Sequence, residues 1–203
     1  MPKVYAIDGI TPVVHPSAFV HPSAVLIGDV IVGARAYIGP CACLRGDFGR
    51  IVVEDGANIQ DTCMLHGFPG KDTVVGAEST IGHGAVLHGC IVRRGALVGM
   101  NCVVNDNAEV GEDAVIAALA FVKAQDTIPA RALAVGIPAK VVRTLSPEEL
   151  RWKKDNMHLY QQLAERSART MREAEALPEV EKNRKRIDIQ GSVPLSELKK
   201  KHA

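Results

Sequence analysis

The sequence contains few aromatic residues, and this scarcity limits the kind of core that it can form. Aromatic residues make up only 4% of the 203 residues, whereas hydrophobic residues of all kinds make up 47%. We therefore expect a narrow interior, filled by Val, Ile and Leu, that has room for few rings. The length is that of one domain with an appendage.

Other features are missing as well. The sequence has no apolar run of 18 residues and no N-terminal basic segment followed by an apolar one, so we expect a cytoplasmic protein without a membrane partner. A net charge of +1 offers no general attraction for nucleic acid. The five cysteines lack paired CxxC spacing, and we interpret them as small core residues in a reducing compartment rather than as disulfides.

A six-residue repeat runs through most of the chain. Aliphatic residues recur at every sixth position in four series, and a small residue follows most of them four positions later. The aliphatic positions include Val14, Val20, Leu26, Val32, Ile38, Leu44, Val53, Ile59, Leu65, Val75, Ile81, Leu87, Val98, Val104, Val110, Ile116 and Val122. Glycine often comes directly after the aliphatic residue, as in Ile38-Gly39 and Val98-Gly99. Repeats of fixed period indicate a repetitive fold.

A period of six fits neither an α-helix nor an alternating strand. It fits a short strand followed by a corner, with three such faces closing a triangular coil. The sequence therefore predicts an all-β fold, a left-handed parallel β-helix of hexapeptide repeats. About six coils stacked at the strand spacing would give a prism roughly 29 Å tall. Glycine is expected at the corners because it adopts turn conformations that other residues avoid.

The character of the chain changes after Val122. Proline-marked turns are followed by Ser146-Pro147-Glu148-Glu149, which has the form of a helix N-cap with a capping box. We expect a β-helix domain at 1–143, a C-terminal helix within 144–177 and a charged tail at 178–203. The helix would pack on the flank of the β-helix through the apolar residues Trp152, Met157, Tyr160 and Leu163.

Three histidines lie within the repeat, which does not need them for packing. His66, His83 and His88 are separated by 17 and 5 residues, and three imidazoles with an open fourth position are typical of a catalytic zinc site. His83 and His88 lie too far apart along an extended chain to bind one ion together. We therefore expect His66 and His88 to form a pair on consecutive coils, with His83 arriving from another subunit of a homotrimer. The alternative is that the histidines are exposed and have no role.

Charged and amide residues precede the first histidine. Leu44-Arg45-Gly46-Asp47 and Asn58-Ile59-Gln60-Asp61 both lie about one coil before it. An arginine and an aspartate could form an ion pair across the subunit boundary, whether or not a metal is present. The Gln60 amide could hydrogen-bond a metal-bound water.

These motifs together resemble the γ-class carbonic anhydrase family, over about residues 10–170. The resemblance implies that His66, His83 and His88 bind zinc at a trimer interface and that Arg45 and Asp61 form the intersubunit ion pair. It also places Gln60 beside the metal-bound water, with Asp47 and Asn58 behind the ligands.

The sequences of these motifs are similar to those of the PaaY and CaiE protein families. These families belong to phenylacetate-degradation and carnitine gene clusters. Segments such as His66-Gly67-Phe68-Pro69, Ile81-Gly82-His83-Gly84 and Leu87-His88-Gly89-Cys90 carry this similarity. For PaaY-like members the resemblance implies a thioesterase that hydrolyses coenzyme A esters. Phe48 stands where the archetypal γ-class enzyme has a glutamate, and the loop after His66 carries no proton-shuttle glutamate, which argues against fast CO2 hydration.

The leading hypothesis is a zinc-dependent hydrolase in which metal-bound hydroxide attacks an acyl-CoA thioester; Fe2+ or Co2+ would also suit three imidazoles. Phe48, Phe68 and Tyr160 could wall the substrate pocket. The alternatives are a carbonic anhydrase acting on CO2 and bicarbonate, a hexapeptide acyltransferase without metal, and a non-catalytic scaffold.

Overall fold

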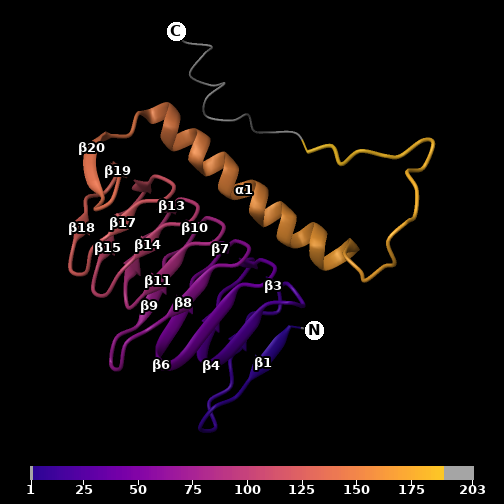
Figure 1. Ribbon diagram of the computed structural model, residues 1–203, viewed down its shortest axis with the longest axis horizontal. Helices are drawn as coiled ribbons and strands as arrows, with labels where there is room; N and C mark the ends of the chain where they lie inside the picture. The colour runs from indigo at the N-terminus through magenta and orange to yellow at the C-terminus, as the bar shows by residue number, and fades with distance from the viewer. Residues whose placement is uncertain (1, 190–203) are drawn as a thin grey trace.

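The computed structural model describes residues 2–189, so the part of the predicted charged tail at 190–203 lies outside the described residues. The chain winds into a parallel β-solenoid of about seven turns with one C-terminal helix. This confirms the predicted left-handed β-helix, with one turn more than expected. Figure 1 shows the strands stacked in order along the prism, with α1 lying across one side.

Three faces make up the prism, and two of them join through the long strands β4 (Val25–Val32) and β6 (Cys43–Val53). Face 1 contains the first halves of β4 and β6 together with β1 (Lys3–Tyr5), β8 (Met64–His66), β11 (Val86–His88), β14 (Val103–Val104) and β17 (Phe121–Val122). Face 2 contains the second halves with β2 (Val13–Val14), β9 (Thr73–Val75), β12 (Ile91–Val92), β15 (Glu109–Val110) and β18 (Thr127–Ile128). Face 3 contains β3 (Phe19–Val20), β5 (Tyr37–Ile38), β7 (Asn58–Ile59), β10 (Thr80–Ile81), β13 (Leu97–Val98), β16 (Val115–Ile116) and β19 (Ala132–Val135), which pairs in antiparallel fashion with β20 (Lys140–Thr144).

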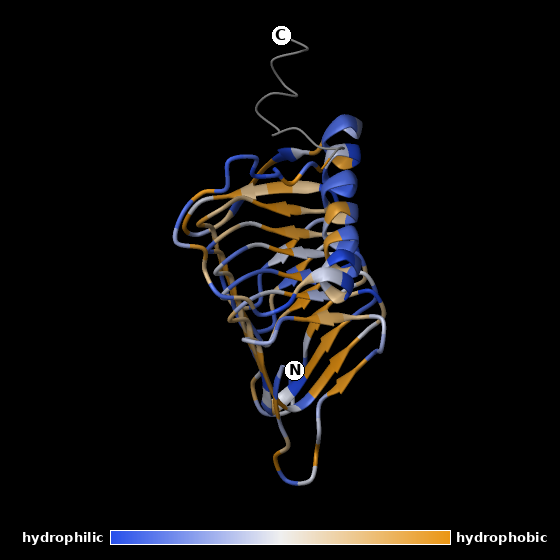
Figure 2. Cartoon of the chain, turned by 90° about the vertical axis from the view of Figure 1, so that its right-hand side faces the viewer, coloured by the Kyte–Doolittle hydropathy of each residue, from blue (hydrophilic) through white to orange (hydrophobic). Residues whose placement is uncertain are grey.

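The repeated aliphatic residues fill the interior, as predicted. From Leu26 to Val122 these side chains are buried, and the small residues that follow them, such as Ala85 and Ala114, are inaccessible as well. Val14 and Val20, in the first coils, are only partly buried against this core. Figure 2 shows the apolar strands stacked in layers.

The prediction of glycine at the corners is confirmed only in part: Gly56, Gly84 and Gly95 adopt positive φ at corners, but many corners carry another residue. The left-handed residue of most corners comes three positions after the aliphatic residue and is often polar, as at Asn101, Asn107 and Asp113, with φ of 55°, 56° and 57°. Asn and Asp tolerate this conformation better than most residues. The glycine directly after the aliphatic residue is needed for another reason. A Cβ at Gly99 would lie 2.6 Å from the backbone nitrogen of Ala118 on the next coil.

The cysteine prediction is confirmed only in part. All five are free; Cys63, Cys90 and Cys102 are buried, while Cys41 is exposed and Cys43 is intermediate. Burial raises the pKa of Cys63 to about 11 and that of Cys90 to about 12, although backbone hydrogen bonds partly oppose the shift. These thiols therefore stay protonated at neutral pH. Cys41 departs from the prediction because it occupies a left-handed corner, with φ of 58°.

Helix α1 runs over Pro147–Thr170 and begins with the predicted capping box between Ser146 and Glu149. It ends before Leu177, so 171–177 is coil rather than part of the helix. The helix contacts β3, β5 and β7 on face 3, and Ala164 packs there against Phe19 and Tyr37. None of the helices in the described residues is long and apolar enough to cross a membrane.

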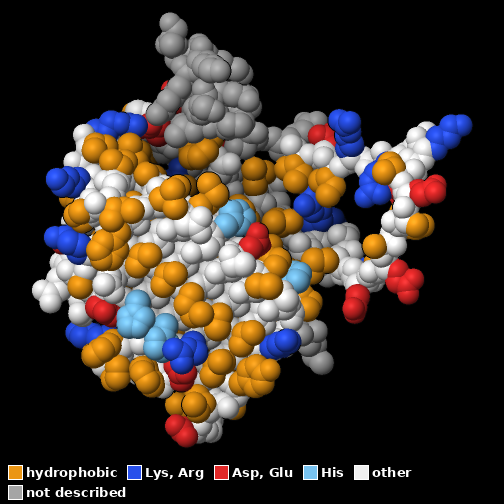
Figure 3. Space-filling view, viewed as in Figure 1, with side chains coloured by type: hydrophobic (Ala, Val, Ile, Leu, Met, Phe, Trp, Pro, Cys, Tyr) orange, Lys and Arg blue, Asp and Glu red, His pale blue; other side chains and the backbone are white. Residues whose placement is uncertain are grey.

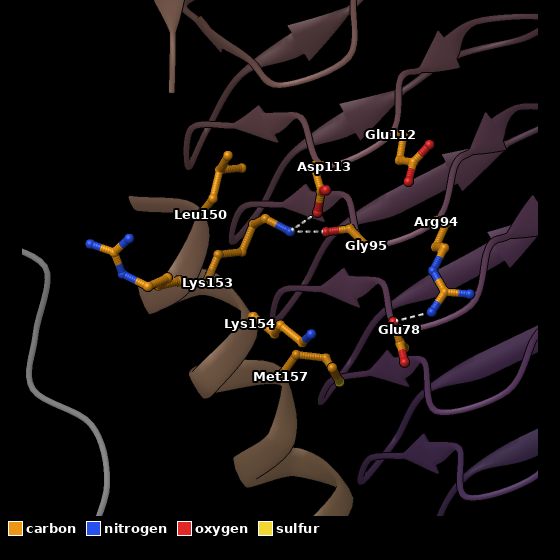
Figure 4. A pocket seen from close by; sticks show the side chains of 10 residues that line it. Glu78, Arg94, Gly95, Glu112, Asp113, Leu150, Lys153, Lys154 and Met157 are labelled. Carbon is orange, nitrogen blue, oxygen red and sulfur yellow. Dashed lines mark hydrogen bonds and ion pairs between the residues drawn. The ribbon is translucent and has the colours of Figure 1, made fainter. Parts of the chain in front are cut away.

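The buried stripe of α1 includes charged residues that an apolar pattern misses. It comprises Glu149, Lys153, Met157, Ala164 and Ser167, whereas Trp152 is only half-buried. Lys153 donates from Nζ to the Gly95 carbonyl and, over 2.6 Å, to Asp113 Oδ1. Figure 4 shows this side chain reaching from α1 to the corners of the prism, beside a cavity of about 300 Å³. Glu149 is similarly held by Arg143, over 2.7 Å.

Candidate metal and catalytic site

The strand register brings His66 and His88 together on face 1. His66 ends β8 and His88 ends β11, and the two residues are partners in the parallel pairing, with Arg45 of β6 beside His66. His66 Nδ1 lies 3.1 Å from His88 Nε2. The predicted pairing on consecutive coils is confirmed. Two nitrogen ligands of a tetrahedral zinc ion lie about 3.3 Å apart, so the spacing of this pair fits a shared ion.

A carboxylate stands behind each member of the pair. Asp47 Oδ1 lies 3.0 Å from His66 Nε2, and Asp106 Oδ1 lies 2.5 Å from His88 Nδ1. If each ring donates its N–H to its carboxylate, the lone pairs on His66 Nδ1 and His88 Nε2 face each other. Two facing lone pairs repel unless a proton or a cation lies between them. Carboxylates behind histidine ligands are usual in metal sites because they fix the tautomer and make the ligand more basic.

The third histidine lies at the opposite edge of face 1. His83 follows β10, and its Nδ1 lies 2.9 Å from Asp61 Oδ2, so its Nε2 faces away from that carboxylate. The Tyr160 hydroxyl of α1 is 3.5 Å from that Nε2. Burial and, secondarily, the negative charge of Asp61 raise the pKa of Tyr160 to about 12, so this hydroxyl remains protonated and acts as a donor at neutral pH.

Gln60 and Asn58 lie beside His83 rather than beside the pair. Gln60 is buried; its Nε2 donates to Asn58 Oδ1 over 3.1 Å, and its Oε1 accepts from the His83 backbone N–H over 3.3 Å. Asn58 in turn donates to Thr80 Oγ1 over 2.9 Å. These bonds fix the Gln60 amide and leave one of its two N–H groups for a ligand.

One chain thus carries two separate groups of site residues. We call Arg45, Asp47, His66, His88 and Asp106 the two-histidine half-site, and Asn58, Gln60, Asp61, His83 and Tyr160 the one-histidine half-site. Within residues 2–189 of one chain, no group of three or more His, Cys, Asp and Glu side chains is arranged to hold a metal ion. The expectation that one chain does not gather all three histidines is confirmed, and their role as ligands stays a prediction.

The remaining histidines in the described residues have different partners. His15 Nδ1 lies 2.9 Å from the Ser17 hydroxyl, and His21 Nδ1 lies 2.8 Å from the Ser23 hydroxyl. His158 lies 3.3 Å from the side-chain oxygen of Gln161. Carboxylate partners therefore distinguish His66, His83 and His88 from these three histidines.

The structure divides the other predicted site residues between the two half-sites. Arg45 donates to Asp47 Oδ2 over 2.9 Å, and both Arg45 and Asp61 remain about 40% exposed, so both can still reach a neighbouring copy. Phe48, with its ring centroid 5.3 Å from that of His66, lies at the two-histidine half-site. Tyr160 lies at the other half-site, so a single chain does not form the pocket walled by Phe48, Phe68 and Tyr160.

Asp106 and Thr73 were missed by the sequence reasoning. Asp106 lies 18 residues after His88, one coil of three six-residue repeats, and that spacing could have identified it. Thr73 is fully buried, and its hydroxyl donates to the His66 carbonyl over 2.5 Å and accepts from the Gly89 N–H over 2.9 Å. It therefore ties the two histidine-bearing strands to the loop between β8 and β9.

We expect Asp106→Asn to lower zinc affinity about 10- to 100-fold, because the amide does not orient His88 or increase its basicity as a carboxylate does. Competition with a chromogenic chelator measures this. Asp126→Asn is the matched control, since Asp126 pairs with Lys123 at a corner. Equal zinc affinities for the two variants would contradict the role given to Asp106.

Comparison with known proteins identifies the family. The chain is 55% identical to the carnitine operon protein CaiE of Escherichia coli O157:H7 over 183 residues, which cover 90% of this chain and 93% of that protein. The chain belongs to the CaiE family of hexapeptide-repeat proteins. CaiE of Shigella flexneri shows the same identity and coverage. Residues 11–46 match the family described as bacterial transferase hexapeptide (six repeats). These matches confirm the resemblance to CaiE.

Solved structures of two bacterial proteins show the same fold. A candidate acetyltransferase of Bacillus cereus superposes with a TM-score of 0.79 at 33% identity, covering 80% of this chain and 95% of that one. A hexapeptide transferase family protein of Anaplasma phagocytophilum gives a TM-score of 0.77 at 35% identity, covering 80% and 96%. Both are described as transferases, which keeps acyl transfer among the functions to be tested.

Proposed function

We propose that the protein is a metal-dependent hydrolase of acyl-CoA thioesters whose active site forms between subunits of a homotrimer. The observation that carries the proposal is the arrangement of the three repeat histidines. Each has a carboxylate behind one ring nitrogen, and its other ring nitrogen has no carboxylate partner. Three neutral imidazoles of this kind fit a divalent ion such as Zn2+, and Fe2+ or Co2+ would be bound by the same set.

The two half-sites border face 1, and this favours assembly from several copies. His66 and His88 end the strands of face 1, while His83 precedes its strand β11. In a ring of subunits, each copy presents one edge to the next copy, so the His83 edge of one subunit can meet the pair on its neighbour. Members of the hexapeptide-repeat transferase family are typically trimers.

An apolar row on face 1 supports such a contact. Met64, Val86, Val103 and Phe121 point outward and are partners in register on successive strands. Met64 and Val103 are each 37% exposed. Figure 3 shows hydrophobic side chains spread over the side of the molecule seen in Figure 1, with Lys and Arg mainly towards its edges. An exposed apolar area of this kind is typical of a protein interface.

The residues around the histidines would stabilise the reaction intermediate and hold the subunits together. A bound divalent ion lowers the pKa of water towards 7 and so supplies hydroxide at neutral pH. Gln60 retains a free N–H and Tyr160 keeps its proton, so both can donate to an oxyanion that develops on the thioester carbonyl. Arg45 and Asp61 would join the subunits as an ion pair beside the site.

Acyl transfer and CO2 hydration are the alternatives. The two solved relatives described as transferases favour transfer, which would need no metal. CO2 hydration would use the same histidines, but Phe48, 62% exposed beside His66, provides no carboxylate to carry protons away from the site.

Metal analysis together with two activity assays tests the proposal. We expect the purified protein to contain metal and to hydrolyse acyl-CoA, to lose this activity on chelation, and to regain it with Zn2+, Fe2+ or Co2+. A metal-free protein that still transfers acyl groups would support the transferase. CO2 turnover without thioester hydrolysis would contradict the proposal in favour of carbonic anhydrase activity.

A further inference from the structure

We propose that a cavity on face 2, next to the two-histidine half-site, binds the acyl group of the substrate, with Val74 and Ile91 as its apolar floor. The inference rests on the proposed function in that the substrate is a coenzyme A thioester. The cavity has a volume of about 380 Å³, and its lining includes Lys71, Asp72, Val74, Gly89, Ile91 and Asn107. This volume lies at the lower end of the range for ligand sites, roughly 300–1,000 Å³.

The cavity lies directly around the corner from the histidine pair. Gly89 and Asn107, in its lining, come immediately after His88 and Asp106 in the sequence. The chain turns at Gly89, with φ of 54°, and Ile91 starts β12 on face 2. Because three residues span at most about 11 Å, the Ile91 and His88 backbones are within reach of one small acyl chain.

The wall of the cavity is fixed by the same residues that position the histidines. The loop between β8 and β9 begins after His66, and its Phe68 and Lys71 are joined by backbone hydrogen bonding. Thr73 closes this loop against His66 and Gly89 through its buried hydroxyl. A group seated in the cavity would therefore keep a constant position relative to the reacting carbonyl.

The floor of the cavity favours an uncharged acyl group. Val74 and Ile91 are partners in register, point outward and are half-buried. Glu109, also in the lining, pairs with Arg93 over 2.8 Å, and this hydrogen bond holds the pKa of Glu109 below its usual value, so the two charges neutralise each other. A compact apolar chain such as hexanoyl would cover the two aliphatic side chains and gain the free energy of their burial.

Ile91→Trp tests the assignment, because the indole would fill the cavity. We expect the ratio of kcat/KM for hexanoyl-CoA to that for acetyl-CoA to fall about tenfold, in the range that a few methylene groups contribute to specificity. Ile31→Trp is the matched control. Ile31 occupies the same outward row, since Ile31, Val52, Val74 and Ile91 are successive partners, yet it does not line the cavity. This control should leave the ratio unchanged.

A binding measurement separates this inference from the proposed function. The non-hydrolysable thioethers S-hexyl-CoA and S-methyl-CoA should bind wild-type protein with different affinities, the hexyl compound more tightly, and Ile91→Trp should abolish the difference. A preference for hexyl that survives in Ile91→Trp, or no preference in wild type, would overturn the acyl site. Tight, cavity-dependent binding without any hydrolysis would contradict only the proposed reaction.

Discussion

Replacing His88 by alanine is expected to abolish tight metal binding and to lower acyl-CoA hydrolysis at least roughly a thousandfold. The variant removes one of the two nitrogens that face each other across 3.1 Å and leaves the Asp106 carboxylate without its imidazole. Without the ion, the pKa of water stays far above neutral pH instead of falling towards 7, so hydroxide is scarce. Metal content and single-substrate kinetics measure both effects.

His15→Ala is the matched control for this variant. His15 also lies in the repeat, but it pairs with the Ser17 hydroxyl rather than with a carboxylate, so its loss should leave metal content and activity as in wild type. His88 itself is about one-third exposed, and its replacement should leave the fold intact. A folded His88→Ala protein with full metal content and activity would refute the assignment.

Gly99→Ala is expected to destabilise the β-helix strongly. Its Cβ would lie 2.6 Å from the Ala118 nitrogen and 2.7 Å from the Ile116 carbonyl oxygen, both on the next coil. Because backbone on both sides is held by the ladder, the coils must separate locally. We expect a cost of about 3 kcal/mol or more, at the upper end of the range for overpacking. Denaturant unfolding measures the change.

Gly70→Ala separates steric from conformational effects. Gly70 has a φ of +75°, and a Cβ there would meet no atom within 4 Å. Its replacement should therefore cost only the left-handed penalty, about 1–2 kcal/mol. If Gly99→Ala were no more destabilising than Gly70→Ala, close approach between coils would not be the reason for the glycine that follows Val98.

The fold could be predicted from the sequence because each coil repeats the same local rule. An aliphatic residue such as Ile81 points inward, a small one such as Ala85 follows, and parallel stacking carries this pattern to the next coil. The helix start was predictable for a similar reason, since the capping box involves only Ser146 and Glu149. Local patterns of this kind need no knowledge of distant contacts.

The features that could not be predicted depend on contacts between distant residues. Lys153 looks like a surface residue until Asp113 and Gly95 are found opposite it, 40 and 58 positions away in the sequence. The glycine that often follows an aliphatic residue was attributed to turn conformation, because the close approach of the next coil is not visible in a single repeat. The pairing of His66 with His88 was predictable from the coil register, and the same register, 18 residues further on, could also have identified Asp106 behind His88.

The central claim is that each site combines His66 and His88 of one subunit with His83 of the next. Heterotrimers containing both His83→Ala and His88→Ala subunits, carrying different tags and purified through both, test this directly. A mixed trimer contains two subunits of one variant and one of the other. In both compositions, one of the three interfaces joins a subunit with intact His66 and His88 to a neighbour with an intact His83.

We therefore predict that the heterotrimers bind and use metal at about one third of the wild-type level, while each parent homotrimer is inactive. Heterotrimers as inactive as both parents would contradict a site shared between subunits.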